Sequence, residues 1–154
     1  MREPLSFFAY GTPKGQPRAK ACRRGNHAGV YDPGTADEWK SWVRTAAIQA
    51  WDGVKWEGPL KVSITIYFPR PKNHYGSGKN ERILKPKAPV WHSSKPDRDN
   101  CDKAIMDALG DLYPPKKIGI WNDDAQVCDG RIKKLYANGD QATGALITIQ
   151  EAWE

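Results

Sequence analysis

The residues of this chain best suited to chemistry are carboxylates in two short segments. The first segment is Lys95-Pro96-Asp97-Arg98-Asp99-Asn100, with Lys103 shortly after it, and the second is Trp121-Asn122-Asp123-Asp124-Ala125-Gln126-Val127. Carboxylates gathered in one place repel one another unless a positive charge lies between them. A hard divalent cation such as Mg²⁺, which takes oxygen ligands, would supply that charge. The two segments together therefore predict a small metal site.

The rest of the chain is basic. Its 154 residues carry a formal net charge of +6, which favours an anionic partner such as nucleic acid, although solubility alone is a simpler interpretation. Basic residues gather in two loop-like segments, 14–24 and about 70–95. We expect these loops to hold phosphates while the carboxylates hold the metal. The expected DNA contacts are Lys14, Arg18, Lys20, Arg23, Arg24, Lys85, Lys87 and Lys95.

The paired acidic segments resemble those of the RusA family, which are Holliday-junction resolvases (crossover junction endodeoxyribonucleases) common in phages and prophages. The resemblance extends over most of the chain. It is carried by Pro96-Asp97-x-Asp99-Asn100, Lys103, Asp107-Ala108-Leu109, Asp123-Asp124-x-Gln126-Val127, the loop Gly11 to Arg18 and the segment Val30-Tyr31-Asp32-Pro33.

The spacing and the resemblance divide the roles among these residues. Asp97 and Asp99 lie two apart, so in an extended segment their side chains point the same way. On a strand, Asp123 and Asp124 point to opposite faces, and spacing cannot choose between them. The resemblance selects Asp124 as the third ligand, and Asp123 is then expected either to support the loop or to act from outside the direct ligands. It thus implies that Asp97, Asp99 and Asp124 bind Mg²⁺, with Mn²⁺ as an alternative.

Lys103 is expected to assist the reaction. It lies one helical turn after Asp99, where its charge can stabilise a phosphate or help to position water, and the resemblance implies that this lysine is essential. Asp107, four residues further along the chain, is expected to pair with Lys103 rather than to bind the metal.

The elements that must position these residues follow from periodicity and turn signals. Residues 5–10 and 59–69 predict strands, and a helix from Thr35 to about Trp51 should be capped by Thr35 and Glu38. A second helix should be capped by Asp99 or Asn100 and should end at Leu109. Further strands are expected at 118–121, 125–136 and 143–151. These elements predict one α+β domain over residues 1–154, with a mixed, mostly antiparallel sheet, helices packed on one side and a basic loop insertion at about 70–95.

Several classes of protein are disfavoured. No apolar run approaches the roughly 20 residues of a membrane span, and no signal-peptide core is present. Three widely spaced cysteines read as reduced thiols of a cytoplasmic protein, and they lack zinc-site spacing. Gly76-Ser77-Gly78-Lys79 lacks the other residues of a phosphate loop, so no nucleotide cofactor is expected.

The resemblance implies a Mg²⁺-dependent endodeoxyribonuclease that resolves four-way junctions by paired nicks during recombination and repair. A phage or prophage gene in a bacterial host would encode it. Because the junction has approximate two-fold symmetry, a homodimer is expected, with exposed apolar surface of the later strands as its interface. Two alternatives stay open, a non-enzymatic phage DNA-binding protein and a nuclease for other branched DNA. Metal-dependent nicking and a panel of substrates discriminate among the three.

Overall fold

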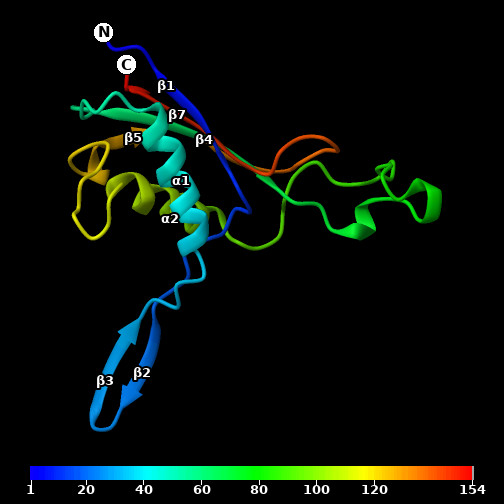
Figure 1. The fold of residues 1–154 in the computed structure, drawn as a ribbon, viewed down its shortest axis with the longest axis horizontal. Helices are drawn as coiled ribbons and strands as arrows, with labels where there is room; N and C mark the ends of the chain where they lie inside the picture. Colours follow the sequence, from blue (N-terminus) through cyan, green and yellow to red (C-terminus); the bar gives the residue numbers. More distant parts are fainter. Residues whose placement is uncertain (154) are drawn as a thin grey trace.

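The computed structural model describes residues 1–153 and contains a five-stranded sheet with two helices on one of its faces (Figure 1). The central strands lie in the order β1 (Leu5–Tyr10), β7 (Gly144–Glu151) and β4 (Leu60–Phe68), each antiparallel to its neighbour. Two short strands, β5 (Val127–Asp129) and β6 (Ile132–Tyr136), pair with β4 in parallel. The predicted α+β class with a mixed sheet is therefore confirmed.

The core lies between the sheet and the helices α1 (Asp37–Ala50) and α2 (Arg98–Gly110). Strand β4 alternates buried and half-buried residues along its whole length, as its sequence predicts. Helix α2 contributes four buried side chains to this core, those of Cys101, Ile105, Ala108 and Leu109.

Helix α1 begins without the predicted capping box. Its N-cap residue is Ala36, and no side chain caps the helix, so the prediction for Thr35 and Glu38 is wrong. The turn before the helix is instead held by Asp32, whose Oδ1 accepts the Gly34 N–H at 2.8 Å. Trp39 is buried, whereas Trp42 is 49% exposed and lies at the margin of the core.

Helix α2 begins earlier than predicted. Its N-cap residue is Asp97, again without a capping hydrogen bond from a side chain, so the prediction of Asp99 or Asn100 as the cap is wrong. Both of those residues lie inside the first turn of the helix. This shift changes the direction in which Asp99 points, with the consequence described below.

The segment after α2 departs most from prediction. Residues 118–121 form no strand and contribute a single bridge between Trp56 and Trp121. The strand predicted at 125–136 is divided into β5 and β6 by Gly130, which has a φ of +132°. A Cβ at Gly130 would collide with the Val62 carbonyl, so the chain bends past β4 at a position where only glycine fits.

Both basic segments are more ordered than predicted. Half of the 14–24 segment forms β2 (Lys20–Arg24), which pairs with β3 (His27–Tyr31) as a hairpin that projects away from the sheet (Figure 1). Residues 70–95 form a lobe with two short 3₁₀ turns, Lys72–His74 and Gly78–Asn80.

Arg70 holds this lobe to the sheet. Its guanidinium donates to the carbonyls of Ala137 (2.9 Å) and Pro89 (2.6 Å) and to Oδ1 of Asn138 (2.6 Å). It also lies over the ring of Tyr136. In residues 1–153, no helix is both long and apolar enough to cross a membrane.

Candidate active site

The N-terminal loop lies directly against the first turn of α2. The Gln16 N–H donates to the Asn100 carbonyl at 2.8 Å. The close approach depends on Gly15, because a Cβ there would lie only 2.6 Å from Cβ of Pro96. The loop Gly11 to Arg18 and the first acidic segment, which both carry the resemblance, are therefore in contact.

Gln16 connects three parts of the structure. Its buried side chain donates to Oδ2 of Asp32 (2.8 Å) and accepts from Nζ of Lys40 (2.9 Å), which is also buried. The Gly34 N–H is the main cause that lowers the pKa of Asp32, with further lowering by Gln16, Lys40 and Lys103. The sequence alone did not predict this connection through Gln16 and Lys40. The only indication was that Gln16 lies in the loop Gly11 to Arg18, which resembles the family.

Lys103 is positioned as the sequence predicts. Its Nζ lies 3.3 Å from both carboxylate oxygens of Asp107, four residues along the same exposed face of α2. Its charge also reaches Asp32 at the base of the hairpin. The ammonium of Lys103 is therefore paired with the Asp107 carboxylate on this face of α2.

Asp97 and Asp99 do not point the same way. The helix begins between them, at Arg98, so the extended geometry assumed from the sequence does not continue to Asp99. Asp97 borders a surface depression shared with Gln16, Arg18 and Lys95. Asp99 borders a different depression, with Arg98, Asp102 and Arg131.

Asp124 is the first residue of a 3₁₀ turn, Asp124–Gln126, and Asp123 is its N-cap, so the strand geometry considered for this pair does not apply. Asp123 holds this turn, because its Oδ1 accepts the Ala125 N–H (2.8 Å) while its own N–H donates to Oε1 of Gln126 (3.0 Å). Oδ1 of Asp124 accepts from Nε1 of Trp121 at 2.7 Å. Asp124 borders a third depression, which it shares with Asp107.

A fourth carboxylate, Asp102, was missed by sequence reasoning. It lies one helical turn after Asp99, a spacing that could have indicated it. Partial burial raises the pKa of Asp102, Arg98 opposes this effect, and the negative charge of Asp124 adds to it. Asp102 on α2 and Asp124 in the second acidic segment are thus near enough for their charges to interact.

Comparison with known proteins decides the family. Residues 10–150 match the family model described as endodeoxyribonuclease RusA. The chain belongs to the RusA family. An uncharacterized protein of Bacillus subtilis (strain 168), YqaN, is 30% identical over 133 residues, which cover 86% of this chain and 88% of YqaN. RusA membership supports an endodeoxyribonuclease that acts on Holliday junctions, and it confirms the resemblance seen in the sequence.

The carboxylates of this RusA-family chain suit a hard cation by chemistry but are not gathered around one point. Carboxylate oxygens are the ligands that Mg²⁺ takes. In residues 1–153, however, no three side chains among Asp, Glu, His and Cys come close enough to hold a metal ion. Asp97, Asp99 and Asp124 border three separate depressions around α2. A preformed three-carboxylate site is therefore absent from the part of the chain that the structure describes.

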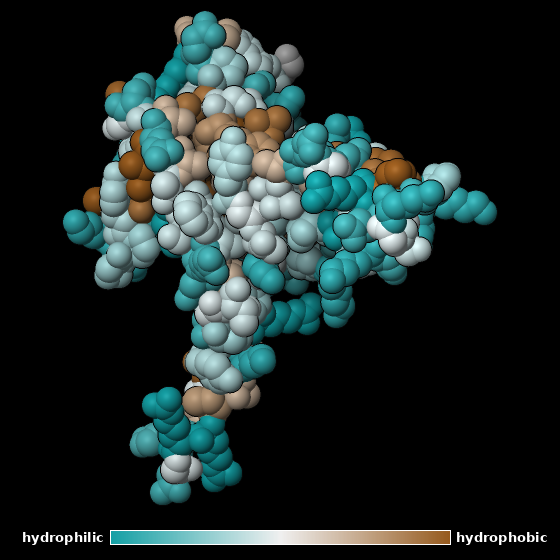
Figure 2. All heavy atoms as spheres, turned by 45° about the vertical axis from the view of Figure 1, so that its right-hand side comes forward, coloured by the Kyte–Doolittle hydropathy of each residue, from teal (hydrophilic) through white to brown (hydrophobic). Residues whose placement is uncertain are grey.

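The predicted DNA contacts lie on three exposed surfaces of the RusA-family fold. Arg18 and Lys95 lie beside Asp97, and Lys14 lies on the adjoining N-terminal loop. The hairpin carries Lys20, Arg23 and Arg24, and the 70–95 lobe carries Lys85 and Lys87. Figure 2 shows both projections covered mostly by hydrophilic side chains, whereas most of the hydrophobic side chains visible in this view lie over the body of the protein.

Proposed function

We propose that the protein is a Mg²⁺-dependent endonuclease that resolves four-way DNA junctions by paired nicks, with Mn²⁺ as an alternative ion. The observation that carries this proposal is the family match over residues 10–150, which includes both acidic segments. Support also comes from helix α2, which carries Asp99 and Lys103, in a structure from which the basic hairpin and the basic lobe both project (Figure 1).

A bound divalent cation would offset charge on the phosphate and lower the pKa of bound water. Asp97, Asp99 and Asp124 would hold it only after binding of the ion and DNA had drawn them together, because they border separate depressions in the structure. Lys103, steadied by Asp107, would place its ammonium near the negative charge that develops on the phosphate. Trp121 would orient Asp124, and Asp123 would keep the turn in shape.

The hairpin and the lobe would grip the DNA backbone. A two-stranded ribbon has dimensions that fit the major groove of B-DNA. Because directly paired residues share a face, Lys20 and Arg24 lie on the same face of the hairpin as His27 and Tyr31. Such contacts with phosphates position the protein without reading sequence.

Two cuts at matching points of the junction require two sites, and we therefore include a homodimer in the proposal. The expected setting is DNA recombination and repair in the cytoplasm of a bacterial host, with the gene carried by a phage or prophage.

One observation favours the non-enzymatic alternative, namely the separation of the carboxylates around α2. A synthetic four-way junction incubated with and without Mg²⁺ decides between the two functions. Paired nicks that require the ion support the nuclease, and tight binding without nicks supports the DNA-binding protein. Replication forks and flaps in the same assay test the third possibility, a nuclease for other branched DNA.

A further inference from the structure

Strand β1 forms one edge of the sheet, and its outer backbone groups are available for pairing. Among the described residues, β1 pairs with β7 alone. The Gly11 N–H donates to the Thr143 carbonyl, which continues the same antiparallel register. Bonded pairs alternate in such a ladder, so the backbone groups of Ser6, Phe8 and Tyr10 point away from β7.

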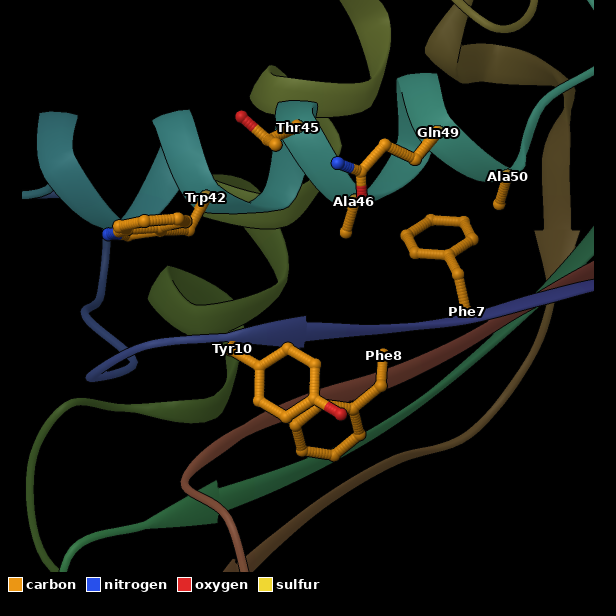
Figure 3. Close-up of a pocket in the computed structure, with 8 residues that line it drawn as sticks. All are labelled: Phe7, Phe8, Tyr10, Trp42, Thr45, Ala46, Gln49 and Ala50. Carbon is orange, nitrogen blue, oxygen red and sulfur yellow. The ribbon is translucent and has the colours of Figure 1, made fainter.

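Both sides of this edge are apolar. Figure 3 shows Phe7 directed towards α1, where it lines a pocket with Trp42 and Ala46, while Phe8 and Tyr10 lie on the other side of the strand. Trp42 is 49% exposed and Tyr10 is 63% exposed. On the open face of the sheet, the ring of Phe8 lies 4.8 Å from that of Tyr10.

The edge also carries no charge. The sequence of strand β1 is Leu-Ser-Phe-Phe-Ala-Tyr. None of the eight residues that line the pocket is Asp, Glu, Lys, Arg or His. This is unusual in a chain with 24 Lys and Arg and 18 Asp and Glu residues. Exposed edge strands are commonly protected by lysine, and on the opposite edge β6 does contain Lys133 and Lys134.

The absence of charge indicates which partner fits. DNA is disfavoured, because nothing on this surface would neutralise a phosphate. A second copy of the chain fits well. A two-fold axis near an interface places charges opposite their own copies, so two chains of net charge +6 associate best through an uncharged surface.

We propose that β1 pairs antiparallel with β1 of a second copy across a two-fold axis, so that the sheet continues from one subunit into the other. Trp42 and Tyr10 would cover the two sides of the joint. The inference rests on the proposed function, which requires two sites, and it specifies the surface that joins them. Leu146 on β7, which is 40% exposed and pairs with Phe8, adds apolar area to the open face beside β1.

Light scattering on the purified protein without DNA tests the interface. The wild type should have about twice the 17.3 kDa mass of one chain. Tyr10→Lys should have half the wild-type mass at the same concentration, because it places two ammonium groups at the joint. Ile83→Lys, at a residue 60% exposed on the lobe, is the matched control and should remain a dimer. A monomeric wild type, or a dimeric Tyr10→Lys, would overturn the inference.

Amide hydrogen exchange of the wild type gives a second test that needs no variant. The outward N–H groups of Ser6, Phe8 and Tyr10 should be protected in concentrated samples and should exchange at least about tenfold faster after dilution below the dimer dissociation constant. Amides of Phe7 and Ala9, which face β7, should stay protected at both concentrations. Fast exchange of the outward amides in a sample that is dimeric by mass would overturn the inference.

Junction cleavage measured on the same samples separates this inference from the proposed function. A wild-type dimer that Tyr10→Lys dissociates but that fails to nick in Mg²⁺ would support the interface and contradict the nuclease. A wild-type monomer that nicks would contradict the interface and leave the nuclease supported.

Discussion

Nε1 of Trp121 donates a 2.7 Å hydrogen bond to Oδ1 of Asp124. The indole is 2% exposed, so the core fixes the donor, and the donor in turn fixes the carboxylate. Asp124 is thereby distinguished from Asp123, whose side chain is occupied by the backbone of the turn. This contrast favours the proposal that Asp124, and not Asp123, would bind the metal.

Trp121→Phe keeps an aromatic ring in the core but removes the N–H. We expect junction cleavage to fall on the order of tenfold, because a hydrogen bond to a charged group is worth roughly 1.5–3 kcal/mol. Binding of the junction should be unchanged. Trp153→Phe, at an exposed residue, is the control, and cleavage by Trp121→Phe at the wild-type rate would show that Asp124 needs no orientation.

Asp97→Asn, Asp99→Asn and Asp124→Asn should each abolish nicking of a labelled junction and leave binding intact in a gel shift with Ca²⁺. Asparagine is nearly isosteric but lacks the charge that a hard cation needs. Without metal, the variants should be at least as stable as the wild type, since repulsion among the acids is relieved.

Asp123→Asn is the matched control for this series. An asparagine oxygen can still accept the Ala125 N–H, so its effect should be milder than that of Asp124→Asn. Full activity of Asp97→Asn and Asp99→Asn would rule out a catalytic role for both.

Lys40→Met removes the buried ammonium group that donates a hydrogen bond to Oε1 of Gln16. We expect a loss of about 1–3 kcal/mol in the free energy of unfolding by urea, because the side-chain oxygen of Gln16 is left buried without its donor. The exposed Lys55→Met should change stability by less than about 0.5 kcal/mol. Equal effects of the two substitutions would show that the connection through Gln16 does not stabilise the fold.

Acid should weaken the packing of His92. Burial, and next the charge of Lys134, lower the pKa of His92 below its ordinary value of 6.5, so the folded state favours the neutral ring, which stacks on Phe68 at 3.9 Å. The stabilisation is complete above pH 6.5 and is lost as the pH falls from there towards the folded-state pKa, because the unfolded chain takes up the proton first.

We therefore expect His92→Phe to reduce the fall in Tm between about pH 7.5 and about pH 5.5. His27→Phe, on the exposed hairpin, is the control and should leave that fall unchanged. The explanation fails if His92→Phe shows the same fall as the wild type.

Replacing Arg23, Arg24, Lys85 and Lys87 together by Ala should reduce the dependence of junction affinity on salt. Each lost phosphate contact changes the slope of log K against log salt by roughly 0.9. A variant with Lys55 and Lys116 replaced by Ala, both exposed outside the two projections, is the control. An unchanged slope in the fourfold variant would show that the hairpin and lobe do not grip the backbone.

The periodicity of apolar residues predicted those helices and strands that bury one face in the core. Strand β4 and the buried face of α2 follow from periodicity alone. The hairpin was missed because β2 and β3 bury nothing and show no apolar alternation. A signal for it was present in Gly25-Asn26, a two-residue turn between the strands, with Gly25 at a φ of +59°.

Contacts between distant segments could not be predicted from spacing. The connection from Lys40 through Gln16 to Asp32 depends on how the loop and the helices pack, and nothing local encodes it. The shared direction of Asp97 and Asp99 was wrong for a related reason. It assumed an extended chain through Asp99, whereas the helix begins two residues after the cis proline bond, at Arg98.

Cleavage of a synthetic four-way junction, labelled in turn on each strand, tests the central claim most directly. We expect the wild type to make paired nicks at symmetry-related positions in two opposing strands with Mg²⁺ or Mn²⁺, and none in EDTA. Asp99→Asn should bind the junction without cutting it. Tight binding by the wild type without nicks in either ion, under conditions where the protein is folded and dimeric, would contradict the proposal.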